Sequence, residues 1–221
     1  MDYRDVDRLI EEGEGFEVEF KRRVSSPEKI ARALVAFSNT RGGHILFGVD
    51  DDGSVVGVES EKSEVDLIRH AGAFFCNPPV EPAIDIVAYD GTDVIVAYVE
   101  ESSEKPHACV GNGHGEGNDE TRVFIRVNDK TVLASREVVR ILRQERPDAP
   151  PVRISIGENE KTLFRYLDLH GRITAREYSR LVNISERRAA RILVSLVRAG
   201  VVRIHTLEQR DFFTLACDLS P

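Results

Sequence analysis

The sequence of 221 residues lacks several features that would indicate a particular class of function. No apolar run approaches the roughly 18 residues that a membrane-spanning helix needs, and the N-terminus MDYRDVDRLIEEGEG is too acidic for a signal peptide. We therefore expect a cytoplasmic protein with no membrane partner. No GxxxxGK[ST] motif is present to bind the phosphates of a nucleotide, and no Ser-His-Asp or Cys-His arrangement can be argued.

Cysteines are also few. Cys76, Cys109 and Cys217 are scattered and form neither a disulfide framework nor a CxxC metal pair. His107, Cys109 and His114 lie within eight residues, but no second ligand pair at zinc spacing accompanies them. We therefore expect no zinc site, and we interpret the three thiols as buried or incidental.

Charge is distributed unevenly along the chain. The net charge of −8 argues against a protein that binds nucleic acids over its whole surface. Residues 1–146 carry 18 lysines and arginines against 29 aspartates and glutamates, a balance of −11, whereas residues 147–221 carry 12 against 9, a balance of +3. This asymmetry predicts that the C-terminal part contacts a polyanion and that the N-terminal part has a different role.

Helical and strand patterns alternate through residues 1–146. Helices are expected at 2–12, 27–39, 64–75 and 135–144, and strands at 16–21, 44–50, 55–58, 83–89, 94–100 and 122–127. Ser26 followed by Pro27 is a typical helix start, because proline lacks an N–H that the first turn does not use. The turn Asp51-Asp52-Gly53 predicts a hairpin between strands 44–50 and 55–58.

The strand at 16–21 has a period of two. Its apolar positions are Phe16, Val18 and Phe20, and its charged positions are Glu17, Glu19 and Lys21. The alternation predicts a half-buried strand whose outer face is charged.

Acidic side chains on or near this strand and after the next one are candidates for a divalent metal site. The candidates are Glu14, Glu17, Glu19, Asp50 and Asp51. Carboxylate oxygens suit Mg²⁺ or Mn²⁺, and Lys21 could stabilise charge in phosphodiester cleavage. Glu19-Phe20-Lys21 also has the Glu-x-Lys spacing of many metal-dependent nucleases. The alternative is that these carboxylates are simply solvated, as acidic side chains usually are.

A proline-rich segment, residues 147–152, is the predicted linker between a first domain, 1–146, and a second, 153–221. Its prolines hold the chain in extended conformations and cannot continue a helix. Beyond it, helices are expected at 158–170, 174–182 and 185–199, and strands at 201–207 and 211–216. This is the order of elements in a winged helix-turn-helix domain.

The helix expected at 185–199 has an apolar face and a basic face. The apolar face consists of Ala189, Ile192, Leu193, Leu196 and Val197. The basic face consists of Arg187, Arg191 and Arg198, with Arg188 nearby and Val194 interrupting it. Arginines in this position predict contact with the DNA major groove, because guanidinium groups bond phosphates and guanine edges. The alternative is a solvated face used for protein contacts.

Four segments of the first domain resemble the Schlafen/AlbA-like domain, a DNA-binding domain of prokaryotic regulators that is sometimes called a divergent AAA domain. They are GEGFEVEFKRR, ALVAFSNTRGGHILFGVDDDGSVVGV, EKPHAC and RVFIRVNDKTVLAS, and the similarity covers about residues 10–146. The residues that follow are similar to the winged-helix tails of such regulators. The implied fold class is α+β, with a Schlafen-like mixed sheet, flanking helices and a small winged helix-turn-helix domain.

The resemblance also implies nucleic-acid affinity. In the RNA-cleaving Schlafen branch, two lobes form a horseshoe, and three acidic residues hold the catalytic metal. The matching positions are Glu14, Glu19 and Asp50 or Asp51. This chain has one lobe and no suitable cysteine cluster, so a homodimer would be needed to rebuild the horseshoe, and zinc is expected to be absent.

The function expected first is that of a homodimeric, DNA-binding transcription regulator without a cofactor, in which the winged helix contacts DNA. Lys21 and Arg41 are the expected phosphate contacts of the first domain. The alternative is a metal-dependent endoribonuclease that acts on structured RNA with Mg²⁺ or Mn²⁺. Its catalytic set would be Glu14, Glu19, Lys21, Asp50 and Asp51. A pure interaction module is the third possibility.

Overall fold

The computed structural model describes residues 1–110, 122–145, 154–207 and 210–216. Its contacts divide the chain into two units, Met1–Ala134 and Ser135–Pro221. Among the described residues, none of the helices combines the length and the apolar character needed to cross a membrane. The predicted linker, residues 147–152, and His114 and Cys217 lie outside the described residues.

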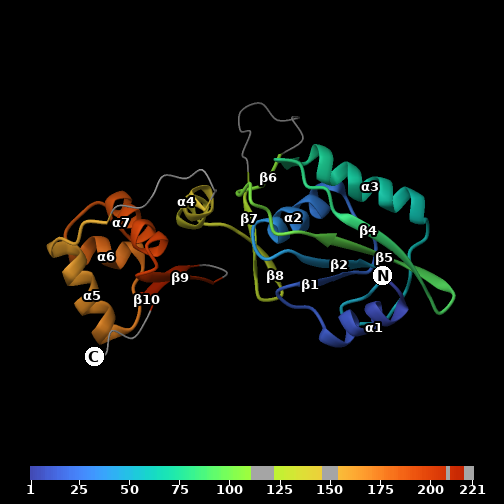
Figure 1. Ribbon diagram of the computed structural model, residues 1–221, viewed down its shortest axis with the longest axis horizontal. Helices are drawn as coiled ribbons and strands as arrows, with labels where there is room; N and C mark the ends of the chain where they lie inside the picture. The colour runs from blue at the N-terminus through green and yellow to red at the C-terminus, as the bar shows by residue number, and fades with distance from the viewer. Residues whose placement is uncertain (111–121, 146–153, 208–209, 217–221) are drawn as a thin grey trace. The chain divides into compact units, whose positions relative to one another are not determined.

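A four-stranded mixed sheet forms the centre of the first unit (Figure 1). Its strands in spatial order are β1 (Val18–Lys21), β2 (Gly43–Phe47), β5 (Thr92–Val99) and β4 (Ala83–Tyr89). Strands β1 and β2 are parallel, whereas β2 pairs with β5, and β5 with β4, in antiparallel fashion. The crossover between β1 and β2 is helix α2 (Pro27–Ser38), which starts at the predicted proline.

Helices cover both faces of this sheet (Figure 1). Helix α1 (Tyr3–Glu12) packs with Leu46 on one face, and α2 and α3 (Glu61–Phe74) pack with Ile45 and Phe47 on the other. Successive side chains of β2 therefore point to opposite cores, as the period of a strand requires. The predicted α+β class, with a mixed sheet and flanking helices, is confirmed.

Two short ladders complete the first unit. Strand β3 (Cys76–Asn77) pairs with β6 (Ala108–Cys109), and β7 (Phe124–Val127) pairs with β8 (Lys130–Leu133). Helix α2 contacts β6 and β7 as well as the main sheet, which explains why it is apolar around most of its circumference.

The predicted hairpin between residues 44–50 and 55–58 is wrong. Residues 55–58 form no strand, and the segment meets the residues after β2 through the isolated bridge Val49–Val55 and through the N–H groups of Val56 and Gly57, which donate to the Gly48 carbonyl oxygen. Both edges of β2 are already occupied, by β1 on one side and β5 on the other. The Asp-Asp-Gly turn forms locally, but it has no free edge at which to add a strand.

In the second unit, the described residues form four helices and an antiparallel pair of strands. These are α4 (Arg136–Gln144), α5 (Glu158–His170), α6 (Ala175–Leu181), α7 (Glu186–Arg198), β9 (Val202–Thr206) and β10 (Asp211–Leu215). Thr174 and Ser185 cap α6 and α7 with their side chains, as their positions predict. Leu163, Tyr178 and Phe213 are among the buried residues of its core.

Helix α4 groups with the second unit, whereas the sequence placed it in a first domain ending at residue 146. Val138, Ile141 and Leu142 of α4 are buried, and α4 packs against α7. The apolar face of α4 therefore packs against a helix that follows the proline-rich segment in the sequence. Local sequence patterns do not reveal this contact.

Candidate nucleic-acid interface

A buried ion pair between Glu19 of β1 and Arg126 of β7 forms the centre of the N-terminal candidate site. The two residues are only 7% and 2% exposed. One carboxylate oxygen of Glu19 accepts a hydrogen bond from Arg126 Nη1, and the other pairs with Lys21 Nζ. The predicted charged outer face of β1 is thus wrong at Glu19, which is covered rather than solvated.

Arg126 also contacts the start of β1, the residues just before it, and a ring of α2. Its Nη2 donates to the carbonyl oxygens of Gly15 at 2.5 Å and Val18 at 3.4 Å, and its guanidinium lies 4.7 Å from the centre of the Phe37 ring. Burial lowers the pKa of Arg126, while the charge of Glu19 opposes this shift. Arg126 is not among the residues predicted from the sequence. The available signal was a single charge within the apolar run Phe-Ile-Arg-Val.

The other predicted carboxylates are placed separately. Glu14 is exposed, and its Oε1 accepts a hydrogen bond from the Phe20 N–H at 2.9 Å. Asp50 pairs with Arg22 at 2.5 Å, and its second oxygen accepts the Asp51 N–H at 3.1 Å. The exposed Asp51 side chain follows in the turn after β2.

These carboxylates do not fit a metal site in the arrangement seen. Within the part of the chain that the structure describes, no three acidic, histidine or cysteine side chains form a group that could hold a metal ion. Both Glu19 oxygens are bound by cations of the protein, and Asp50 is bound by Arg22. Glu14, Glu19 and Asp50 would have to release these partners before they could share a cation.

The two predicted phosphate contacts of the first unit differ in availability. Lys21 is committed to Glu19, and 30% of its side chain is exposed. Arg41 is exposed, and its guanidinium stacks over Phe16 with 5.2 Å to the ring centre. Of the two, Arg41 is the better placed to meet a phosphate, because its charge is not neutralised by a close carboxylate in the described structure.

In the second unit, the N-terminal half of α7 presents the predicted arginines. Arg187, Arg188 and Arg191 are exposed, and the capping Ser185 hydroxyl accepts the Arg188 N–H at 3.3 Å. Arg188 and Arg191 line a shallow pocket of about 290 Å³ together with Glu160. This end of α7 therefore offers three positive side chains to solvent.

The C-terminal half of the predicted basic face is not free. Val194, which lies between Arg191 and Arg198 on that face, is 3% exposed, and Ala190 is 2% exposed. Both are buried on a helix against which α4 packs. Arg198 is half-buried and engaged in an interaction. The predicted stripe is thus reduced to its first three arginines, because Val194 is buried and Arg198 is half-buried and engaged.

A family profile covers most of the first unit. The profile described as Schlafen, AlbA_2 matches residues 14–135, more than half of the chain. The chain belongs to this family. The matched range contains the whole main sheet and both short ladders, so the Schlafen, AlbA_2 domain of this chain coincides closely with the first unit.

Two solved structures are similar to the chain. The DIP2311 protein of Corynebacterium diphtheriae aligns with a TM-score of 0.48 and 18% identity over 80% of this chain and 32% of its own. The N-terminal domain of an ATP-dependent DNA helicase RecG-related protein from Nitrosomonas europaea aligns with a TM-score of 0.42 and 20% identity. The alignment covers 69% of this chain and 95% of that domain. The chain thus spans about a third of the length of the Corynebacterium protein.

Membership in the Schlafen, AlbA_2 family confirms the resemblance identified from the sequence for the first domain. It supports nucleic-acid binding as the broad class of function. The finer assignments concern the second unit, which the profile leaves almost entirely unmatched.

Proposed function

We propose that this protein binds DNA through its second unit and acts as a transcription regulator. The observation that carries the proposal is the exposed group Arg187, Arg188 and Arg191 at the start of α7, directly after the short turn from α6. In a helix-turn-helix domain, the N-terminal residues of the second helix contact base edges and phosphates. Three arginines at this position suit that contact.

The strand pair β9–β10 supports a winged form of this domain. Arg203, His205 and Arg210 are exposed there. The His205 ring stacks on Phe212 at 4.8 Å, and the Arg172 guanidinium lies 5.7 Å from the centre of the same ring. Positive and aromatic groups on a hairpin next to α7 suit a wing that follows the DNA backbone.

The Schlafen, AlbA_2 domain would then supply dimerisation, a local nucleic-acid contact at Arg41 and Lys21, or both. A two-fold dimer would present two copies of α7 to a palindromic site. The −11 balance of residues 1–146 favours a local contact over binding along the whole domain.

The proposal is tested with the full chain and a fluorescent DNA duplex library, by anisotropy at several salt concentrations. Replacing Arg187, Arg188 and Arg191 with alanine should weaken binding more than tenfold. If each arginine binds one phosphate, the slope of log K against log salt should become shallower by about 3, since each phosphate that is no longer neutralised accounts for about 0.9.

A matched control removes three exposed arginines of the first unit, Arg4, Arg8 and Arg69, and so changes the net charge equally. This control should keep most of the affinity. Equal losses in the two triple variants would mean that only overall charge matters, and an unchanged affinity in the α7 variant would overturn the proposal. Cross-linking and light scattering of the same samples test the dimer.

The Schlafen-like endoribonuclease remains a prediction from the sequence. No contact in the described structure favours it over DNA binding, because its carboxylates are held by Lys21, Arg22 and Arg126. We therefore propose it only as the alternative activity that the same preparations should be tested for.

A further inference from the structure

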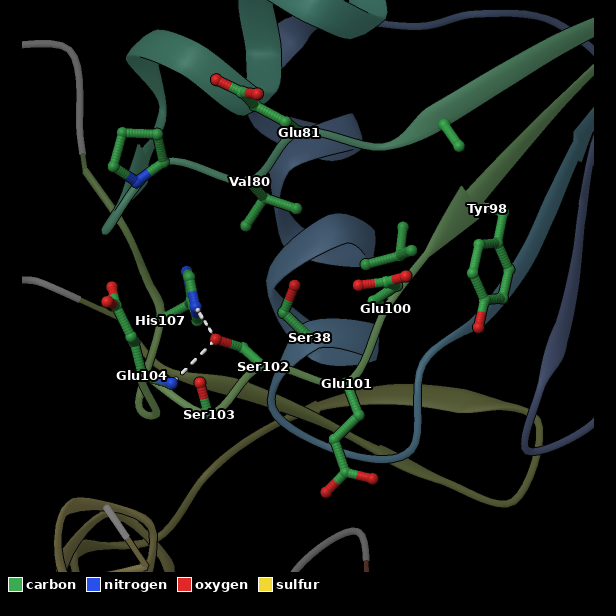
Figure 2. A pocket seen from close by; sticks show the side chains of 13 residues that line it. Ser38, Val80, Glu81, Tyr98, Glu100, Glu101, Ser102, Ser103, Glu104 and His107 are labelled. Atoms are coloured by element: carbon green, nitrogen blue, oxygen red, sulfur yellow. Dashed lines mark hydrogen bonds between the residues drawn. The ribbon is translucent and has the colours of Figure 1, made fainter. Parts of the chain in front are cut away.

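A pocket of about 520 Å³ lies in the first unit at the C-terminal end of α2, and none of the side chains of the candidate interface lines it. It is lined by the end of β5, the loop that follows β5, and the segment before β4 (Figure 2). Its volume is in the range of small-molecule sites, which are usually about 300–1,000 Å³.

The lining of this pocket is rich in hydrogen-bond acceptors and carries no lysine or arginine. Four of the residues that line it are glutamates: Glu81, Glu100, Glu101 and Glu104. Glu101 pairs with Lys105, whereas the carboxylates of the other three have no partner among the described residues. An anionic ligand such as a phosphate would be repelled here, so this pocket is not a second nucleic-acid contact.

Ser38 adds an uncharged polar group to the lining of the pocket. It is 2% exposed, it lines the pocket, and no described residue forms a hydrogen bond with its hydroxyl group. Figure 2 shows its side chain pointing from α2 toward the space between Val80 and Glu100. The Ser38 oxygen is not among the described polar atoms that are both fully covered and without a partner, so it is reached from the pocket and is free to accept a hydrogen bond there.

His107 and Ser102 form a fixed wall of the same pocket. His107 Nδ1 lies 2.9 Å from the Pro78 carbonyl oxygen, which can only accept, so this nitrogen carries a proton. With His107 neutral, Nε2 accepts from the Ser102 hydroxyl at 2.7 Å, and the Ser102 oxygen accepts the Glu104 N–H at 3.0 Å. The His107 and Ser102 side chains thus already have hydrogen-bond partners. The acceptors of the pocket that remain available to a ligand are the Ser38 oxygen and the unpaired carboxylates.

We propose that this pocket binds a small organic cation, an ammonium or guanidinium group on a short hydrocarbon chain. Such a group supplies only donors, which the Ser38 oxygen and the carboxylates of Glu100 and Glu104 can accept. Val80 and the ring of Tyr98 offer apolar surface to the hydrocarbon part. The proposed ligand is a free amine that binds to the Schlafen, AlbA_2 domain. Its binding does not depend on the function proposed for the second unit.

The test uses the full chain and agmatine, which carries both a guanidinium and an ammonium group, in isothermal titration calorimetry at low salt. We expect saturable binding at one site. The double variant Glu100→Gln/Glu104→Gln should weaken it at least tenfold, whereas Glu59→Gln, an exposed glutamate that does not line the pocket, should leave it unchanged. Ser38→Ala should weaken binding by about threefold while the melting temperature stays equal or rises, since the hydroxyl that is removed had no partner.

Three results would overturn the proposal. The first is the absence of saturable heat with agmatine at millimolar concentration. The second is an equal loss of agmatine affinity in Glu59→Gln and in the double variant. The third is that Mg²⁺, at the same concentration of positive charge, binds as tightly as agmatine. A blocked peptide, acetyl-Gly-Arg-Gly-amide, separates the two sources of a guanidinium. If the peptide binds more tightly than agmatine, the natural ligand is an arginine side chain of a protein. That result would overturn the proposal that the ligand is a free amine.

Discussion

Asn39 and His107 bond each other in both directions. Asn39 Nδ2 donates to the His107 carbonyl oxygen at 2.8 Å, and the His107 N–H donates to Asn39 Oδ1 at 2.7 Å. Nδ2 also donates to the Phe124 carbonyl oxygen at 2.9 Å. Asn39 is 2% and His107 5% exposed. The residue at the end of α2 therefore fixes two segments that lie 68 and 85 residues further along the chain.

Replacing Asn39 with alanine should destabilise the first unit by about 3–5 kcal/mol. The change removes three hydrogen bonds and leaves two carbonyl groups and one N–H buried without partners, each at a cost of about 1–3 kcal/mol that partial hydration reduces. Urea unfolding followed by circular dichroism measures the loss. A loss below about 1 kcal/mol would show that water replaces these bonds and that Asn39 has no structural role.

Replacing Glu19 with alanine should cost about 3–5 kcal/mol, because Arg126 would stay buried without its counter-charge. Glu17→Ala, at an exposed position just before β1, should change the free energy of unfolding by less than about 0.5 kcal/mol. The double variant Glu19→Ala/Arg126→Met should recover part of the loss. If the double variant is as unstable as the sum of the single variants, the pair does not interact as the structure indicates.

The buried Cys76 and the partly buried Cys109 predict a pH dependence of stability. Burial raises the pKa of Cys76 to about 12 and that of Cys109 to about 11. Because thiols in the unfolded chain ionise near about 8.5, the unfolded state releases protons first, and these residues should reduce the free energy of unfolding as the pH rises above that value.

Peptide-resolved alkylation checks the same thiols. At pH 8, Cys76 in the folded protein should react with iodoacetamide at least about a hundredfold more slowly than in urea, since the thiolate is the reacting form. Replacing Cys76 and Cys109 with alanine should flatten the alkaline branch of the stability curve. Rapid alkylation of Cys76 in the native protein would contradict its burial.

Incubation with structured RNA and Mn²⁺, with and without EDTA, tests the endoribonuclease alternative. We expect no cleavage that EDTA abolishes, because Glu19 and Asp50 are held by Lys21, Arg126 and Arg22. Cleavage that is abolished by EDTA and in Asp50→Asn, but retained in Glu17→Gln, would show that the carboxylates rearrange around a metal. Asp50 is the better variant for this assay because Glu19→Ala is expected to destabilise the unit by about 3–5 kcal/mol.

The sequence alone determined the elements whose signals are local. The proline after Ser26 begins α2, and Thr174 and Ser185 cap α6 and α7. These features depend on residues within a few positions of one another, where backbone geometry and side-chain period act directly. The motifs at Glu19 and Asn39 also sufficed to identify the family.

Tertiary structure decided what distant segments do to each other. It placed β5 rather than residues 55–58 beside β2, paired Glu19 with Arg126 from 107 residues away, and buried Val194 of α7. A wheel or a periodicity shows which residues share a face, but not which element will cover that face. Burial and ion pairing depend on the covering element, and so the choice between solvated, paired and ligand-binding carboxylates was not available from the sequence.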